Sequence, residues 1–220
     1  MFEKSYSFLQ LIKQNNNREW YHANKNIYNE AKLEFEHVNE LLLHKMASID
    51  TSLISLSPKD CIFRIFRDVR FSKDKSPYKT NFGTFIAPGG RKAGKAGYYL
   101  HLEPGGSFIA GGIHMPPSPV LKAIRQEIYE HTNEFKTLVE EARKKSNLDG
   151  FFGEKLSGAP RGFSKDFPDI ELLKYKSYGL SKSISDGEIK SDTALENILH
   201  YFQHLHPLLQ FLNNAISEAS

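Results

Sequence analysis

The chain has 220 residues, of which 40% are hydrophobic and 25% are charged, and these proportions are typical of a globular protein. Lysine and arginine number 29 against 26 acidic residues, and the resulting net charge of +3 does not by itself indicate nucleic-acid binding, because clustering of the cations decides that. The single cysteine excludes an internal disulfide framework, and no apolar run approaches the ~20 residues that a membrane span needs. The N-terminus lacks the features of a secretory signal, so we expect a cytoplasmic protein without membrane association or cofactor.

The first 50 residues have the periodicity of helices. Residues 5–15 predict a short amphipathic helix with Ser5 or Ser7 as its N-cap. From Asn24 to about Ser48, apolar residues recur at spacings of three and four and form one continuous stripe. The sequence Ser-Pro-Lys-Asp at 57–60 then ends this helical region.

The middle third has the pattern of short strands with turn-length connections, which predicts an antiparallel meander. The predicted strands are residues 62–66, 81–87, 97–103 and 107–113. Alternation along the third strand places Tyr99, His101 and Glu103 on one face. The glycine pair at 111–112 predicts a bulge or a close approach of another segment.

The remainder is mostly helical. We expect helices at about 119–130 and 133–144, an ordered loop at 147–168, a short helix at 168–175 and an additional strand at 176–184. Two final helices are predicted, one capped by Ser191 and one beginning at Pro207. The fold class is therefore α+β, a single domain in which an antiparallel β-meander at about 61–113 is flanked by N-terminal helices (about 5–50) and a mostly helical C-terminal region (118–220).

Three motifs that can carry chemistry lack the context that their chemistry needs. Residues 89–95 fit the phosphate-binding pattern G-x-x-x-x-G-K, but Ala96 replaces the hydroxyl residue and a strand pattern follows, so we interpret them as a hairpin loop. His200 and His204 have a feasible metal-ligand spacing, yet no zinc motif accompanies them, and we expect no metal site. Cys61 is predicted to be an inert buried thiol.

The strongest functional signal is the stretch at 61–80, where cations alternate with aromatic and β-branched residues. Its cations are Arg64, Arg67, Arg70, Lys73, Lys75 and Lys79. If residues 62–66 form a strand, Arg64 shares a polar face with His101 and Glu103. Arginine forks bind phosphate or carboxylate in a bidentate manner, and a histidine beside them could act as acid or base.

We therefore predict a site for a small phosphorylated or carboxylated ligand, in a pocket between the sheet and the N-terminal helices. Its predicted ligand-binding residues are Arg64, Arg67, Arg70, Lys73, Lys79, His101 and Glu103. Two alternatives stay open. Asp68 and Asp74 could pair with the cations and only hold the loop in shape, or the cations could form an exposed patch for nucleic acid or a protein partner. The weak net charge favours the small ligand, and catalysis and oligomeric state stay open.

Several strings resemble the family catalogued as domain of unknown function 2461. They lie at 16–20, 24–25, 67–79, 97–106, 121–128 and 160–168. The resemblance covers nearly the whole chain, which implies one domain, and it implies an intracellular protein without assigning a catalytic residue. Tyr21 and His114 stand where the family pattern leads us to expect other aromatics, and His114 adds an ionisable group near the end of the sheet.

Overall fold

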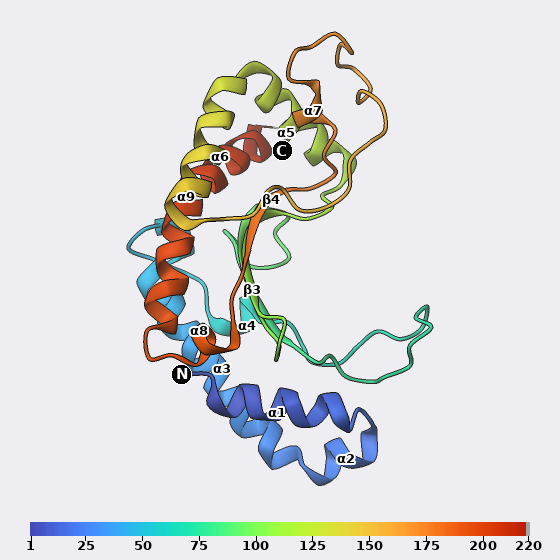
Figure 1. Ribbon diagram of the computed structural model, residues 1–220, viewed down its shortest axis with the longest axis vertical. Helices are drawn as coiled ribbons and strands as arrows, with labels where there is room; N and C mark the ends of the chain where they lie inside the picture. The colour runs from blue at the N-terminus through green and yellow to red at the C-terminus, as the bar shows by residue number, and fades with distance from the viewer. Residues whose placement is uncertain (219–220) are drawn as a thin grey trace.

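The protein is a four-stranded antiparallel sheet with helices before and after it, as seen in a computed structural model that describes residues 1–218 (Figure 1). The strands are β1 Phe82–Ile86, β2 Gly97–Leu102, β3 Phe108–Ile113 and β4 Tyr178–Ser183. They lie in the order β1-β2-β3-β4, each antiparallel to the next. The predicted α+β meander is therefore confirmed, with the strand near 176–184 added at its edge.

Helices occupy both ends of the described chain. Before the sheet are α1 Glu3–Gln14, α2 Arg18–Ala23, α3 Lys25–Met46, the short 3₁₀ helix η1 Thr51–Leu53 and α4 Pro58–Cys61. After β3 come α5 Ser118–Glu130, α6 Thr132–Ser146, α7 Ile170–Leu173, α8 Asp186–Lys190 and α9 Ala194–Glu218. The predicted N-cap of the first helix is wrong: Phe2 holds that position, and Ser5 is buried inside α1, where its hydroxyl donates to the carbonyl of Ala31 at 2.9 Å.

The strand predicted at residues 62–66 is also wrong. Ile62 and Phe66 make only isolated bridges, to Thr84 and Tyr78. After Phe63 the chain leaves the edge of β1 and pairs with its own returning limb, through the backbone bonds Arg67 N to Pro77 O (3.0 Å) and Lys79 N to Ile65 O (2.8 Å). Residues 62–80 therefore form a projecting arm, because local pairing within the segment replaces pairing along the sheet (Figure 1).

The C-terminal helix is continuous, whereas the sequence predicts a new helix at Pro207. Pro207 lies inside α9 and removes one backbone N–H donor from it. Leu205, Leu208 and Leu209 are buried on both sides of the proline. Their burial keeps the helix in register across the interruption. Ser191 does not cap α9, which begins three residues later, at Ala194.

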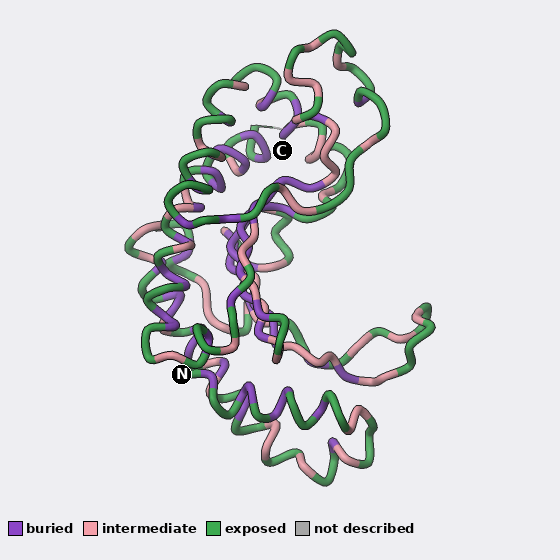
Figure 2. Tube along the Cα trace, in the orientation of Figure 1, coloured by how far each residue is buried: buried purple, intermediate pink, exposed green. Residues whose placement is uncertain are grey.

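In the described part of the chain, residues 1–218, helices cover one face of the sheet only (Figure 1). α9 packs on β2 and β3 and α3 packs on β1, so that Tyr98, Leu100 and Leu102 are buried beneath them. The predicted close backbone approach at 111–112 is found at Gly112, where a Cβ would lie 2.1 Å from the Tyr178 carbonyl oxygen, and at Gly111 a Cβ would lie 2.8 Å from the Leu205 side chain. The opposite face carries Tyr99 and His101 and has no helix over it (Figures 1 and 2). Within residues 1–218, no helix has the combination of length and apolar character that crossing a bilayer requires.

Candidate functional site

A cleft of about 1210 Å³ lies over the face of the sheet that no helix covers. Its floor is made of small residues on all four strands, namely Gly83, Gly97, Ala110, Gly112 and Ser181. The arm closes one side with Phe63 and Lys79, and the loop between β1 and β2 contributes Arg91 and Lys95. We call this space the sheet cleft. Its volume is sufficient for a ligand of drug-like size.

The sheet cleft lies on the face opposite α3. The sequence placed the pocket between the sheet and the N-terminal helices, and that placement is wrong for this cleft. The apolar stripe of α3 is buried against α1, α4, α9 and β1, on the other face of the sheet from the cleft.

Aromatic rings form the part of the floor nearest the arm. The Tyr99 ring lies 6.3 Å from that of Phe63 and 5.6 Å from that of Phe108, between ring centroids. His101 stacks on Phe108 at 4.6 Å with an interplanar angle of 18°. A Cβ on Gly83 would lie 2.9 Å from the Tyr99 hydroxyl. The missing side chain of Gly83 therefore leaves the space in which that hydroxyl sits.

A chain of hydrogen bonds runs along β2 beneath this aromatic surface. The Tyr99 hydroxyl lies 3.0 Å from His101 Nδ1, and His101 Nε2 lies 3.2 Å from Glu103 Oε2. The other carboxylate oxygen of Glu103 accepts a 2.7 Å bond from the Thr80 hydroxyl, and Asn81 Nδ2 lies 3.4 Å from His101 Nδ1. These contacts connect β2 to the two residues that precede β1, and they hold the imidazole between a phenol and a carboxylate.

The protonation states of the two end groups follow from their surroundings. Burial by itself would raise the pKa of the Glu103 carboxyl, but hydrogen bonds from Thr80 and His101 outweigh burial and the pKa is lowered. Burial, followed by the charge of Glu103, raises the pKa of the Tyr99 phenol. Glu103 is thus a carboxylate that only accepts, so His101 Nε2 carries the hydrogen between them, and in the tautomer with a single ring hydrogen Nδ1 accepts from Tyr99.

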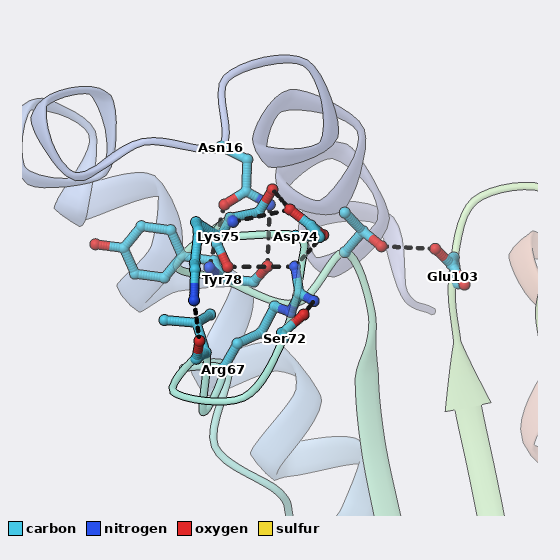
Figure 3. A network of polar contacts seen from close by, with 10 residues as sticks. Asn16, Arg67, Ser72, Asp74, Lys75, Tyr78 and Glu103 are labelled. Atoms are coloured by element: carbon cyan, nitrogen blue, oxygen red, sulfur yellow. Dashed lines mark hydrogen bonds and ion pairs between the residues drawn. The ribbon is translucent and has the colours of Figure 1, made fainter.

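The arm is held in shape by its own ion pairs (Figure 3). Arg67 pairs with Asp74 and also donates to the carbonyl of Ser76 at 3.3 Å. Arg70 pairs with Asp68 at 2.6 Å. Hydrogen bonds from Arg70 lower the pKa of the Asp68 carboxyl. Hydrogen bonds from Ser76, and then from Arg67, lower the pKa of the Asp74 carboxyl. Both aspartates therefore pair with arginines of the arm. This is the arrangement expected if Asp68 and Asp74 pair with the cations to hold the loop in shape.

Asn16 fastens the base of the arm to the turn between α1 and α2 (Figure 3). Its amide nitrogen donates to the Tyr78 carbonyl at 2.9 Å, and its amide oxygen accepts from Tyr78 N at 3.1 Å. The Tyr78 ring stacks on Tyr21 with centroids 4.2 Å apart. These two hydrogen bonds and the ring stack orient the limb that carries Lys79 into the cleft.

The seven predicted ligand-binding residues occupy two places. Lys79 lines the sheet cleft, and His101 and Glu103 form the chain beneath its floor. Arg67 and Arg70 belong to the pairing within the arm, and Arg64 and Lys73 are exposed on it. That all seven bind one ligand stays a prediction.

Lys79 and Arg67 are the partly buried cations among those of the arm, and Lys79 differs from Arg67 because it has no ion pair in the described chain. Its ammonium lies 5.3 Å from the centroid of the Phe63 ring, and no carboxylate within residues 1–218 forms an ion pair with it. Burial, and then the charge of Arg64, lowers the pKa of Lys79.

Sequence reasoning missed Tyr99, Arg91 and Lys95 as residues of the site. The signal for Tyr99 was present, because strand alternation placed it on the face of His101. Arg91 and Lys95 belong to the loop that resembles a phosphate-binding motif, and the hairpin interpretation of that loop is confirmed.

The other clusters are less developed. His204 accepts or donates a 2.7 Å bond with the Ser146 hydroxyl, and its pKa is lowered by burial. Cys61 is fully buried, as predicted, and burial raises its pKa to about 11. In the described chain, one group could share a metal ion: Glu127, Glu130 and His131, of which the last two are exposed.

The chain was compared with protein families, curated proteins and solved structures. Neither the curated proteins nor the solved structures contain a match. A family model described as "Conserved hypothetical protein (DUF2461)" matches residues 4–211. This match spans nearly the whole chain, including the arm, the sheet and the helices that cover it, and the protein therefore belongs to the DUF2461 family.

Proposed function

We propose that the sheet cleft binds a small organic anion that combines a flat apolar body with a phosphate or carboxylate group. The single observation that carries the proposal is Lys79, a half-buried cation without an ion pair in residues 1–218, at the edge of an aromatic floor. A desolvated cation gains more from an anionic ligand than a solvated one does, because water screens it less.

The charge balance of the lining supports an anion. Lys79, Arg91 and Lys95 line the cleft, and its acidic lining residue is Glu188. Glu188 is already occupied, since it accepts from the backbone and the hydroxyl of Ser185 at the start of α8. Arg91 donates to a backbone carbonyl at 2.6 Å and Lys95 to a hydroxyl at 2.7 Å, so both keep donors for a ligand.

The floor supports a flat body. Glycine, alanine and serine residues leave the backbone plane of the sheet uncovered, and Phe63, Tyr99 and Phe108 lie at the edge of this floor. Rings of a ligand can stack on such side chains or lie on the exposed backbone.

Anilinonaphthalene sulfonate, which has a flat apolar body and one anionic group, tests this proposal by fluorescence titration. We expect Lys79→Met to weaken its binding by about 10- to 150-fold, because a hydrogen bond to a charged group contributes about 1.5–3 kcal/mol and methionine keeps the apolar stem. Lys73→Met is the matched control, since Lys73 is exposed on the same arm.

The uncharged analogue phenylnaphthylamine should bind parent and Lys79→Met equally. Phenyl phosphate should displace the sulfonate from the parent, and phenol should not. Equal affinity of the sulfonate for the parent and a folded Lys79→Met variant would remove Lys79 from the site and refute the proposal.

A second candidate function is binding of single-stranded nucleic acid by the arm. Its supporting observation is Phe71, whose side chain is 96% exposed near the tip, with the Arg70 guanidinium 5.9 Å from its ring centroid. Exposed aromatic rings beside cations are the means by which proteins stack unpaired bases.

A further inference from the structure

We infer that Tyr99 is a catalytic residue of the sheet cleft, whose hydroxyl transfers a proton between the bound organic anion and His101, with Glu103 as the positioning residue. The inference rests on the proposed function, since it takes the same cleft as the binding site. It adds a reaction class, general acid–base catalysis, and the group that meets the ligand.

The exposure of the side chains decides which member of the chain meets the ligand. Tyr99 lines the sheet cleft, whereas the side chain of His101 is only 15% exposed and is stacked under Phe108. Glu103 is held by Thr80 and His101 through its two carboxylate oxygens. A ligand in the cleft therefore contacts the phenol oxygen, and the imidazole acts through that oxygen.

The hydrogen bonds give the direction of proton transfer. With the His101 hydrogen on Nε2, the Tyr99 O–H donates to Nδ1 across 3.0 Å, and a lone pair of the phenol oxygen is left for a ligand in the cleft. A ligand group X–H can pass its proton to that oxygen while the phenol proton moves to Nδ1. The X–H bond and the original O–H bond break, and a new O–H and a new N–H bond form. The product is an imidazolium at His101, and the neighbouring Glu103 carboxylate stabilises its positive charge.

The same path in reverse makes Tyr99 an acid. In the forward direction, where Tyr99 acts as a base, His101 is needed to accept the phenol proton. The reason is that burial keeps the phenol protonated, so that no free phenolate is available at neutral pH. A substrate of this class is an organic anion with an O–H or an acidic C–H placed at Tyr99. The anionic group would lie toward Lys79, the cation that lines the same cleft.

Geometry holds the acceptor in place. Asn81 contacts the same ring nitrogen as Tyr99, Phe108 stacks on the imidazole, and Gly83 leaves the space for the phenol oxygen. Such fixed orientation is what general acid–base catalysis needs. A purely structural tie between β2 and the segment before β1 would need Thr80, Asn81 and Glu103, but no tyrosine that lines the cleft.

The reagent para-(fluorosulfonyl)benzoate, a flat aryl carboxylate with a sulfonyl fluoride, tests the inference. The Tyr99 oxygen attacks sulfur, an S–O bond forms, the S–F bond breaks with loss of fluoride, and the phenol proton goes to His101. Mass spectrometry then compares labelling of Tyr99 with labelling of Tyr129, a 39% exposed tyrosine of the same chain. We expect Tyr99 to react roughly 100-fold faster, within the range of general-base catalysis.

Variants distinguish proton transfer from simple exposure. Labelling of Tyr99 should depend on the His101 imidazole, whose Nε2 contacts the carboxylate of Glu103 just after the end of β2. His101→Gln should reduce the labelling rate of Tyr99 to that of Tyr129. Gly83→Ala, which changes no titratable group, should also reduce it by displacing the hydroxyl.

Benzenesulfonyl fluoride, which lacks the carboxylate, separates failure of this inference from failure of the proposed function. If only the anion site is wrong, both reagents label Tyr99 rapidly and at equal rates. If the proton transfer is wrong, neither reagent labels Tyr99 faster than Tyr129. A Tyr99 rate that stays high in His101→Gln also refutes the inference.

Discussion

Two glycines determine the shape of the cleft floor at the scale of single residues. Gly112 has φ +149°, and a Cβ there would lie 2.1 Å from the Tyr178 carbonyl oxygen on β4. Gly83 instead leaves space for one polar atom, the Tyr99 hydroxyl. Gly112 allows β3 and β4 to approach each other, and Gly83 leaves room for the Tyr99 hydroxyl.

We expect Gly112→Ala to lower the free energy of unfolding by about 2–6 kcal/mol, because backbone strain and overpacking each cost about 1–3 kcal/mol. Urea denaturation followed by circular dichroism measures the loss. Gly150→Ala is the control, since nothing lies within 4 Å of a Cβ there, and it should change stability by no more than about 0.5 kcal/mol. A Gly112→Ala variant as stable as the control would show that β3 and β4 can separate at no cost.

The arm is the element on which the candidate site depends most. Its two limbs pair with each other, its arginines pair with its own aspartates, and Asn16 joins its base to the N-terminal helices. Lys79 is thereby held at the cleft by a side chain 63 positions earlier in the sequence. An element without regular strand structure is made rigid by side-chain bonds to the backbone.

Asn16→Ala should release the base of the arm. The change removes both bonds to the Tyr78 backbone and leaves partly buried groups unpaired, which costs about 1–3 kcal/mol and makes local opening about 5- to 150-fold more frequent. Limited trypsin digestion measures this as faster cleavage after the arm cations. Asn15→Ala is the control, because the Asn15 amide donates only to the Leu11 carbonyl within α1 and its cap. Equal digestion of the two variants would contradict the anchoring role.

At the scale of the whole molecule, the charges are distributed so that few cations are left for a polyanion. The net charge is +3, and two of the arm's arginines are neutralised by neighbouring aspartates. Arg64, Lys73 and Lys75 form no ion pair within residues 1–218. This distribution favours one small anion in the cleft over a long strand along the arm.

Fluorescence anisotropy with a labelled oligothymidylate tests the second candidate function. The three exposed arm cations without an ion pair among the described residues, Arg64, Lys73 and Lys75, predict a slope of only about −2 for log K against log salt, from about 0.7 for each neutralised phosphate of a single strand. We therefore expect no measurable binding at physiological salt. Tight binding with a steep slope that Phe71→Ala abolishes would favour the arm as a nucleic-acid site over the sheet cleft.

The parts of the protein that depend on local pattern were predictable. Alternation along β2 correctly separated Tyr98 from Tyr99, and the apolar stripe of residues 24–48 correctly predicted α3, because both follow from the spacing of neighbouring side chains. The errors lie where local signals conflict with distant contacts. Residues 62–66 have a strand composition but pair within the arm, and Pro207 is tolerated because the packing of α9 on the sheet compensates for it.

The sequence by itself determined the α+β class, the antiparallel meander, the cationic character of residues 61–80 and the shared face of Tyr99, His101 and Glu103. Tertiary structure alone decided which cations are free. Arg67 and Arg70 are paired inside the arm, whereas Lys79 is directed into a cleft whose far side comes from the loop of Arg91 and Lys95. The physical reason is that ion pairing depends on distances of a few ångströms between segments, and spacing along the chain does not set those distances.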